Sequence, residues 1–438
     1  MIKIKFYGAA GTVTGSMHLV RLPAFSFLVD AGYFQGRFSE LNNEPLEDLR
    51  DVPYIFLTHA HLDHVGRLPV LVRNGFRGTV ITHRATWHIA RYILEDAFNL
   101  MDEEEPLYDL KDLQRTFSLP VKFVEYGKEY DINGLKFRVR DAGHVLGSAF
   151  YEYEYRGKRF TFSGDLGNRN KPIVRDPEMP NRADVVVVES TYGNRDHRPF
   201  QESVEELKEA VFSTLNRGKV LIPSFALERS QELLYIFKGW ENAGEWPGEW
   251  KVVLDSPLAT KILTEFLKFP ECYDMEAYAR FLKDNPFKLK NLLITRTKEE
   301  SKRLNHVRTG LSIVAGSGML TGGRAIHHLK HMIEDPNNAL VFVGYQAEGT
   351  LGREIVDGAE KVWILDRFYD VNLRVYTING FSSHAGRTEL LEWIDSADPN
   401  TVILVHGEDH ARESLREGVL ERENREVLMP TLYDEIEV

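Results

Sequence analysis

Four residues that can bind a metal ion lie close together near the start of the chain, in the segment Thr58-His-Ala-His-Leu-Asp-His64. Residues 51–57 before it are mostly apolar, which predicts a buried strand with this segment at its C-terminal end. His59 and His61 share one face of an extended chain, while Asp63 and His64 can turn toward a second point. Imidazoles and a carboxylate at this density favour zinc or a similar cation, and two groups of ligands indicate two ions. The alternative is a surface histidine cluster, which the preceding strand disfavours.

The composition describes a folded protein without internal disulfides. Of the 438 residues, 43% are hydrophobic and 27% are charged, and the single cysteine is Cys272. This length predicts two domains, or one domain with a large insertion. A metal ion must be held by His, Asp or Glu, because one cysteine cannot form a cysteine-rich site. The net charge of −12 argues against a surface that attracts nucleic acid throughout, but it allows a local basic groove.

Two kinds of pattern divide the chain. Up to Asp184-Val-Val-Val-Val-Glu189 short strands predominate, with one helix expected at Ala85–Asn99. Beyond Asn194, amphipathic helices alternate with buried strands, which predicts a parallel sheet covered on both faces. We therefore expect a first domain at 1–195, an inserted α/β domain at 196–370, and a segment at 371–438 that returns to the first domain, beginning with a strand at 374–378. The acidic run at 101–105 is expected to be a solvated loop or helix end.

Five further residues of ligand type follow expected strands elsewhere in the chain. Glycine lies beside nearly all of them and lets the backbone turn sharply. One such strand ending is more often a structural hydrogen-bonding group, but their recurrence indicates a shared site. These residues are Asp30, His144, Asp165, His384 and His406.

These motifs resemble a known superfamily. The segment 58–64 is similar to the signature of the metallo-β-lactamase superfamily, and Asp30, His144 and Asp165 match its remaining motifs in order. The motifs Val188-Glu-Ser-Thr-Tyr-Gly193, Ala315-Gly-Ser-Gly-Met-Leu-Thr-Gly-Gly-Arg324, Gly380-Phe-Ser-Ser-His-Ala-Gly386 and Val405-His-Gly407 resemble the β-CASP subgroup of nucleic-acid-processing nucleases. This subgroup includes the nuclease subunit of the mRNA 3′-end cleavage factor and RNase J. The resemblance covers essentially the whole chain and implies an α/β fold, in which a metallo-β-lactamase αββα sandwich carries an inserted parallel-sheet β-CASP domain.

The resemblance also implies the roles of single residues. Asp30 would accept hydrogen bonds from the site histidines, and Glu189 would orient His384. His384 lies outside the implied metal shell and could give the leaving oxygen its proton. Many members of the family have an acidic residue at the position that is Gly386 in this chain. The resemblance therefore does not define the hydrogen bonds around His384. The implied ligands of two Zn²⁺ are His59, His61 and His144 for one ion and Asp63, His64 and His406 for the other, with Asp165 between them.

Residues for contacting the substrate are expected in the second half of the chain. Residues 316–323 lie between an expected strand and helix, where free backbone N–H groups favour a phosphate, although a tight glycine turn is the alternative. His327, His328 and His331 have the spacing of a solvated helix face, so we do not expect them to bind metal. The candidates for contacting RNA are Ser317, Gly318, Arg324, Arg353 and Ser383.

The sequence as a whole predicts a two-zinc ribonuclease that binds single-stranded RNA in a cleft between two domains. Endonuclease action is favoured, 5′-exonuclease action is a second mode, and a homodimer is left open. A small-molecule hydrolase acting on a thioester or lactone is one alternative, but the large insertion argues for a strand-binding groove. A non-enzymatic RNA-binding subunit is disfavoured because every ligand position is filled. The N-terminus lacks a signal-peptide core and no segment reaches transmembrane length, so we expect a cytoplasmic location and no membrane partner.

Overall fold

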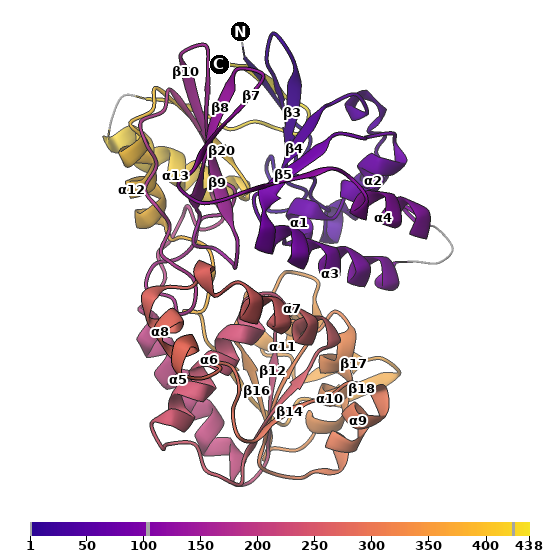
Figure 1. Cartoon of the computed structure of the whole chain (residues 1–438). Helices are drawn as coiled ribbons and strands as arrows, with labels where there is room; N and C mark the ends of the chain where they lie inside the picture. Colours follow the sequence, from indigo (N-terminus) through magenta and orange to yellow (C-terminus); the bar gives the residue numbers. More distant parts are fainter. Residues whose placement is uncertain (1, 102–105, 423–424) are drawn as a thin grey trace. The chain divides into compact units, whose positions relative to one another are not determined.

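The computed structural model describes residues 2–101, 106–422 and 425–438, which form two compact units (Figure 1). The first unit contains residues 1–169, 174–196 and 383–438, and the second contains residues 170–173 and 197–382. The acidic run expected at 101–105 lies outside the described residues, apart from Met101. In the described part of the chain, no helix is long and apolar enough to span a bilayer.

Two seven-stranded sheets form the centre of the first unit. In sheet order, the first consists of β22 (Glu435–Glu437), β1 (Lys3–Phe6), β2 (His18–Arg21), β3 (Ser26–Val29), β4 (Tyr54–Phe56), β5 (Thr79–His83) and β6 (Val121–Val124). The second consists of β21 (Glu426–Leu428), β20 (Thr401–Val405), β11 (Val185–Glu189), β10 (Lys158–Phe162), β9 (Ala149–Tyr155), β8 (Leu135–Asp141) and β7 (Glu129–Ile132).

The two sheets pack face to face through aromatic side chains. The ring centroids of Phe27 and Tyr153 are 5.1 Å apart, and those of Phe56 and Phe137 are 5.0 Å apart, so each pair joins one sheet to the other. Rings at these separations add to the apolar burial that stabilises the interior. Outside the second sheet, Trp393 and Leu415 from two helices join the cluster that contains Val186. This layering is the αββα sandwich expected from the sequence.

Helices cover the outer faces of this sandwich (Figure 1). Their bounds are α1 (Leu62–Val65), α2 (Leu68–Arg73), α3 (Arg84–Leu100), α4 (Leu110–Phe117), α12 (Arg387–Ala397) and α13 (Asp409–Arg422), with the 3-10 turns η1 (Gly36–Asn43) and η2 (Glu47–Leu49).

The second unit is built on a six-stranded parallel sheet. Its order is β14 (Leu292–Ile294), β13 (Lys251–Asp255), β15 (Leu311–Ala315), β12 (Lys219–Pro223), β16 (Ala339–Phe342) and β19 (Arg374–Thr377), and β17 (Lys361–Ile364) pairs separately with β18 (Arg367–Asp370). The helices are α5 (Phe200–Leu215), α6 (Arg229–Asn242), α7 (Pro257–Lys268), α8 (Met275–Lys283), α9 (Lys298–Arg303), α10 (Gly323–Met332) and α11 (Leu351–Val356), with turns η3 (Pro270–Cys272) and η4 (Leu304–His306).

Local sequence explains how these helices begin and where they pack. Before α7, the Ser256 hydroxyl accepts a hydrogen bond from Ala259 N, and Pro257 occupies the first helical position, where its missing N–H costs nothing. Leu329 and Met332 of α10 join the buried cluster that includes Ile313 of the sheet. The alternation of helices and strands therefore produces the covered parallel sheet that the sequence predicts.

The second unit ends later in the chain than the sequence indicates. We expected residues 371–438 to return to the first domain, but β19 (374–377) pairs in parallel with β16, with Leu340 opposite Val375. The return to the first unit begins at Ser383. A strand of four residues carries no signal for which of two sheets it joins, and its partner depends on tertiary contacts.

Candidate metal centre

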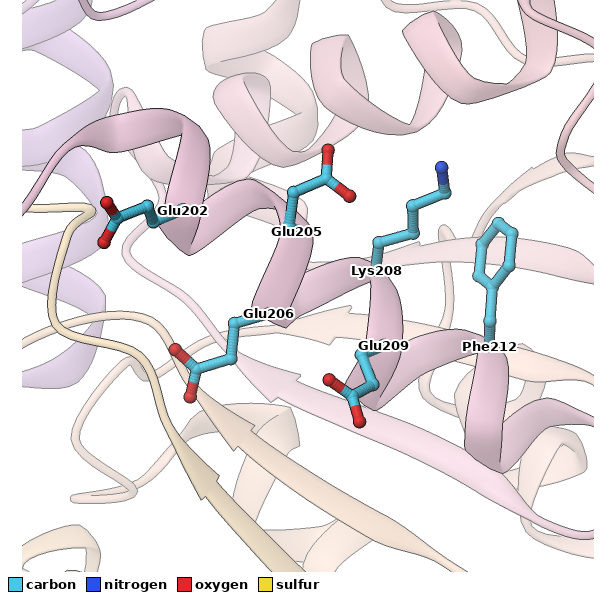
Figure 2. Close-up of a pocket in the computed structure, with 6 residues that line it drawn as sticks. All are labelled: Glu202, Glu205, Glu206, Lys208, Glu209 and Phe212. Atoms are coloured by element: carbon cyan, nitrogen blue, oxygen red, sulfur yellow. The ribbon is translucent and has the colours of Figure 1, made fainter.

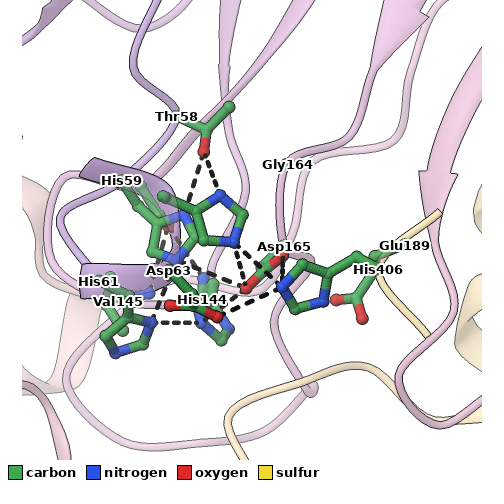
Figure 3. A network of polar contacts seen from close by, with 12 residues as sticks. Thr58, His59, His61, Asp63, His144, Val145, Gly164, Asp165, Glu189 and His406 are labelled. Atoms are coloured by element: carbon green, nitrogen blue, oxygen red, sulfur yellow. Dashed lines mark hydrogen bonds and ion pairs between the residues drawn. The ribbon is translucent and has the colours of Figure 1, made fainter. Parts of the chain in front are cut away.

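Strand direction brings the predicted metal ligands to one end of the first unit. In the second sheet, β8, β10, β11 and β20 all run in the same direction. Strands β8 and β10 are each antiparallel to β9, β11 is parallel to β10, and β20 is parallel to β11. The chain directly after these strands carries His144, Asp165 and His406, while Glu189 is the last residue of β11. The loop after β4 supplies His59 and His61, and the helix that follows it, α1, supplies Asp63 and His64. Figure 3 shows the side chains of His59, His61, Asp63, His144, Asp165 and His406 gathered at this end.

Two site residues have backbone conformations that are rare outside glycine. Asp30 has φ of 62° and His406 has φ of 47°, both in the left-handed region. Such conformations cost free energy, and they persist where surrounding contacts enforce them, often at functional sites. Both residues follow a buried strand directly, so each turn aims the side chain across the end of the sheet.

One group of ligand atoms gathers around one oxygen of Asp165. His59 Nε2 and His144 Nε2 lie 3.4 and 3.6 Å from Asp165 Oδ2. His61 Nδ1 lies 3.1 Å from His59 Nε2 and 3.2 Å from His144 Nε2. All four ligand atoms lie within 4.8 Å of one another, so a single cation between them could contact each.

A second group adjoins the first through the same carboxylate. His64 Nε2 lies 3.2 Å from His406 Nε2 and 3.3 Å from Asp165 Oδ2. His406 Nε2 lies 3.4 Å from Asp63 Oδ2 and 3.7 Å from Asp165 Oδ1. The two groups therefore correspond to the two ligand sets implied by the sequence resemblance, with Asp165 between them.

His64 and His144 each use the ring nitrogen that faces away from the cluster, Nδ1, to bond an oxygen that can only accept. His64 Nδ1 donates to Asp30 Oδ2 over 2.7 Å, and His144 Nδ1 donates to the Ser383 carbonyl over 3.1 Å. Each Nδ1 therefore carries a hydrogen, and the Nε2 of each ring faces the cluster. Outward hydrogen bonds of this kind are typical of histidines that bind metal ions.

Two threonine hydroxyls fix the other two rings in the same way. The Thr58 hydroxyl donates to Asp30 Oδ2 over 2.8 Å, so its oxygen can only accept from His59 Nδ1 at 3.0 Å. The Thr191 hydroxyl donates to the His406 carbonyl and accepts from His406 Nδ1, each over 3.1 Å. The sequence reasoning did not single out these threonines, although both lie inside motifs that it used.

Burial adjusts the protonation of the cluster. Burial lowers the pKa of His61 to about 4 and holds the pKa of His59 and His144 well below the ordinary histidine value, so all three are neutral at pH 7. Burial also disfavours protonated His64, but the adjacent Asp165 and Asp30 outweigh it and raise its pKa. Two carboxylates thus favour positive charge at a ring that faces the cluster.

This donor set fits divalent cations. The Nε2 atoms of His59, His64, His144 and His406 all lie within 3.7 Å of a carboxylate oxygen of Asp165. Asp165 Oδ1 is buried and accepts no hydrogen bond from any residue that the structure describes. Lone pairs and a buried, unsatisfied carboxylate oxygen facing one another are costly without a positive charge between them. Imidazole and carboxylate donors are those that zinc and similar cations prefer.

His384 lies beside this cluster and is held by a carboxylate. Its Nδ1 lies 3.2 Å from both oxygens of the fully buried Glu189. Glu189 Oε1 also accepts a hydrogen bond from Leu166 N over 2.7 Å, next to Asp165. Burial disfavours protonated His384, but Glu189 outweighs it and raises the pKa of His384 to about 9. The side chain is 21% exposed, so this protonated imidazole can be reached from solvent.

The residues predicted to contact RNA are divided between the two units. Ser383 lies in the first unit, where its carbonyl fixes His144. The other four lie in the second unit. There the Ser317 hydroxyl bonds with Thr321, and Arg353 pairs with Asp357 over 2.8 Å. Gly318 packs beside Phe225, and Arg324 pairs with a buried carboxylate.

The carboxylate that binds Arg324 belongs to Asp255, which is fully buried at the end of β13. It also accepts hydrogen bonds from Thr295, from Ser301 and, over 2.5 Å, from His328 Nε2. The prediction of a solvated face for His328 is therefore wrong, since this ring is buried. Spacing alone does not reveal that a carboxylate from another strand lies beside the helix.

A depression on α5 in the second unit is unsuited to nucleic acid (Figure 2). Most of its lining side chains are carboxylates, which repel phosphate groups. The residues are Glu202, Glu205, Glu206, Lys208, Glu209 and Phe212.

Three family models match the chain. "Metallo-beta-lactamase superfamily" matches residues 10–215, "Beta-Casp domain" matches residues 230–355, and "Zn-dependent metallo-hydrolase RNA specificity domain" matches residues 369–430. Together they extend over both units and over the segments that carry the candidate metal ligands.

Characterised relatives are similar over most of the chain. Ribonuclease TTHA0252 of Thermus thermophilus is 43% identical over 411 residues, which cover 93% of this chain and 94% of the relative. Transcription termination factor FttA of Methanocaldococcus jannaschii is 32% identical over 461 residues, covering 100% of this chain and 72% of the relative. Endoribonuclease YSH1 of Yarrowia lipolytica is 30% identical over 94% of this chain, which spans about half (51%) of that relative.

A solved structure, that of a protein of unknown function from Enterococcus faecalis V583, has the same fold. It superposes with a TM-score of 0.61 over 99% of both chains, at 12% sequence identity. A likeness at this identity concerns the arrangement of the chain and carries no functional argument.

Proposed function

The chain belongs to the β-CASP family of metal-dependent hydrolases within the metallo-β-lactamase superfamily, and from this premise we propose that it is a ribonuclease that cleaves single-stranded RNA. The observation that carries the proposal is the position of His384, which the buried Glu189 carboxylate holds at 3.2 Å beside a cluster whose donors suit two cations. The match to an RNA specificity domain and the names of the relatives support RNA cleavage over the small-molecule alternative.

We assign the cluster to two Zn²⁺. His59, His61 and His144 would hold one ion, Asp63, His64 and His406 the other, and Asp165 would contact both. When bound, divalent cations supply the positive charge that acidifies water and offsets the charge growing on the phosphate during hydrolysis. Asp30 keeps His64 and Thr58 in place, because one carboxylate accepts hydrogen bonds from both.

His384 acts as the general acid in this proposal. Hydrolysis of a phosphodiester leaves a ribose oxygen that needs a proton, and a nearby imidazolium can donate it. Glu189 holds Nδ1 of His384, so the proton is donated from Nε2. Glu189 also favours the charged form of the ring, which keeps the proton available at neutral pH.

The proposal is tested with a closed circular single-stranded RNA and a matched linear RNA carrying a 5′ or 3′ label. The purified protein is depleted of metal with a chelator, and Zn²⁺ is added back in steps while bound zinc and cleavage are measured together. We expect cleavage of both RNAs to return as two equivalents of zinc bind. Circles have no ends, so their cleavage identifies endonuclease action.

Two results would contradict the assignment. Cleavage of the linear RNA alone, with mononucleotides released from the 5′ end, would replace endonuclease by 5′-exonuclease action. Failure of the zinc-loaded protein to cleave any RNA, together with hydrolysis of a thioester or lactone, would overturn the ribonuclease assignment itself. Asp165→Ala is the control for cleavage by a contaminating nuclease, because it should remove both zinc and activity.

A further inference from the structure

Arg195 is an unpaired cation close to the proposed general acid. Its side chain is exposed, and its guanidinium stacks over the ring of Tyr192 with 5.0 Å between the guanidinium carbon and the ring centroid. The Tyr192 ring lies 6.2 Å from the His384 ring, centroid to centroid. Among the described residues, no carboxylate forms an ion pair with Arg195. This differs from Arg169, which pairs with Glu392 over 2.6 Å.

The acidic residues nearest in sequence are occupied elsewhere. The Asp196 carboxylate accepts hydrogen bonds from Thr388 N over 2.7 Å and from the Thr388 hydroxyl over 2.6 Å. Glu189 is occupied by His384, Leu166 and Thr191. The charge of Arg195 is therefore available to an anion from outside the chain. An arginine without a partner on a fixed backbone suits a phosphate, because its planar group offers several donors at once.

The backbone around Arg195 is held in place. Arg195 N donates to the Tyr192 carbonyl over 3.2 Å, and the Arg195 carbonyl accepts from Arg387 N over 3.0 Å. A Cβ on Gly193 would lie 2.4 Å from the Ala411 carbonyl oxygen, so this turn packs directly against α13. A side chain on such a turn loses less freedom on binding than one on a mobile loop.

We propose that Arg195 and Tyr192 form a subsite for the RNA nucleotide that leaves with the proton of His384, with Arg195 binding the next phosphate and Tyr192 contacting the ribose or base. This proposal rests on the proposed function. The leaving nucleotide keeps the oxygen that His384 protonates, so this nucleotide must lie against His384. The Tyr192 ring is next to His384 and can therefore contact the same nucleotide. Nucleotides commonly stack on aromatic rings, and arginines commonly bind their phosphates.

The test compares Arg195→Gln with Arg195→Lys and with the control Arg182→Gln. Arg182 is similarly exposed but pairs with Asp398 over 3.5 Å, and it precedes β11, at the end of that strand opposite Glu189. We expect Arg195→Gln to lower kcat/KM on a defined single-stranded RNA by about tenfold at low salt, the effect of one charged hydrogen bond. The change should be in KM, with zinc content unchanged.

Salt dependence separates a phosphate contact from a structural role. Losing one phosphate contact reduces the slope of log kcat/KM against log salt concentration by about 0.7 for a single strand. Arg195→Gln should show this reduction, while Arg195→Lys and Arg182→Gln should keep the wild-type slope. Tyr192→Leu should raise KM without changing the slope, because the charge of Arg195 remains.

Neutral phosphates locate the contact along the RNA. In an RNA with a mapped cleavage site, methylphosphonates are placed one position at a time. The wild type should lose activity when the first phosphate of the leaving side is neutral. Arg195→Gln should cleave this modified RNA and the unmodified RNA at the same rate, because its contact to that phosphate is already absent. An unchanged salt slope, or additive losses at every position, would overturn the subsite. A wild type that cleaves no RNA would instead overturn the proposed function.

Discussion

Replacing His384 with alanine should separate proton transfer from metal binding. His384 Nδ1 is paired with Glu189. Three groups of side chains could hold a metal ion, and the two that we assign to zinc do not include His384, which belongs to the third with Asp165 and Glu189. The variant should therefore keep the zinc content and RNA affinity of the wild type. The cleavage rate should fall by roughly 10²–10⁴, the usual contribution of a general acid. At ~1.36 kcal/mol for each factor of ten, this is about 2.7–5.4 kcal/mol of barrier.

The pH dependence of the cleavage rate tests whether His384 acts in its protonated form. Because Glu189 raises the pKa of His384 to about 9, the ring is mostly protonated at pH 7, and the rate should fall as pH rises through that pKa. Cations bound nearby repel the proton and move this alkaline limb to lower pH. Glu189→Gln should move it lower still, because the carboxylate that raises the pKa is gone. His384→Ala should lose the limb.

Single-turnover cleavage of labelled RNA over a range of pH, with zinc measured on the same samples, makes the test. His410→Ala is the matched control, since His410 also lies next to a glutamate, 3.6 Å from Glu408, but is 65% exposed. Loss of one zinc equivalent in His384→Ala would make His384 a ligand. An unchanged rate, or an alkaline limb that survives in this variant, would refute its role as the acid.

Three other substitutions test the remaining parts of the structure. Asp165→Ala should lose bound zinc and all cleavage, measured by metal analysis and RNA assay, and full activity would exclude a carboxylate shared by two ions. Asp30→Ala should weaken zinc binding by about 10–100-fold in a chelator competition, because His64 loses the acceptor that fixes its ring; unchanged affinity would contradict this. Asp255→Ala should destabilise the second unit by about 3–5 kcal/mol in urea unfolding, since it leaves Arg324 and His328 unpaired, and a loss below about 1 kcal/mol would show that this cluster is not stabilising.

The sequence allowed the layers and the candidate cluster to be predicted for one physical reason. Residues that follow parallel strands meet at the same end of a sheet, so Asp165 and His406 can be placed together although they are far apart in the chain. Burial of both faces makes such strands continuously apolar, as in Val185–Glu189, and therefore easy to recognise.

What the sequence did not indicate depends on contacts between distant segments. His328 has the spacing of an exposed helix face, and only the fold reveals Asp255 beside it. The strand 374–377 could have joined either unit, because its residues pack equally well on any sheet edge. The hydroxyls of Thr58 and Thr191 needed the ring positions before their role in fixing histidines could be seen.

Main-chain hydrogen bonds join the segments that carry His384, the proposed proton donor, and Asp165, the carboxylate proposed to contact both ions. Gly167 and His384 form an antiparallel bridge, in which Ala385 N donates to the Leu166 carbonyl over 2.8 Å and Asn168 N donates to the Ser383 carbonyl over 3.1 Å. Asp165 lies directly before this bridge. The return of the chain at Ser383 therefore sets the distance from His384 to the metal cluster, whatever the length of the segment inserted before it.

Glu389 closes the same bridge from its outer side. Its carboxylate accepts hydrogen bonds from Gly386 N over 2.9 Å and from Arg169 N over 3.0 Å, one amide from each strand of the bridge. Position 386 is glycine, and Glu389 supplies a carboxylate to its backbone from the first turn of α12. The carboxylate that holds the loop of His384 thus belongs to Glu389, three residues after Gly386, and no side chain at position 386 is needed for it.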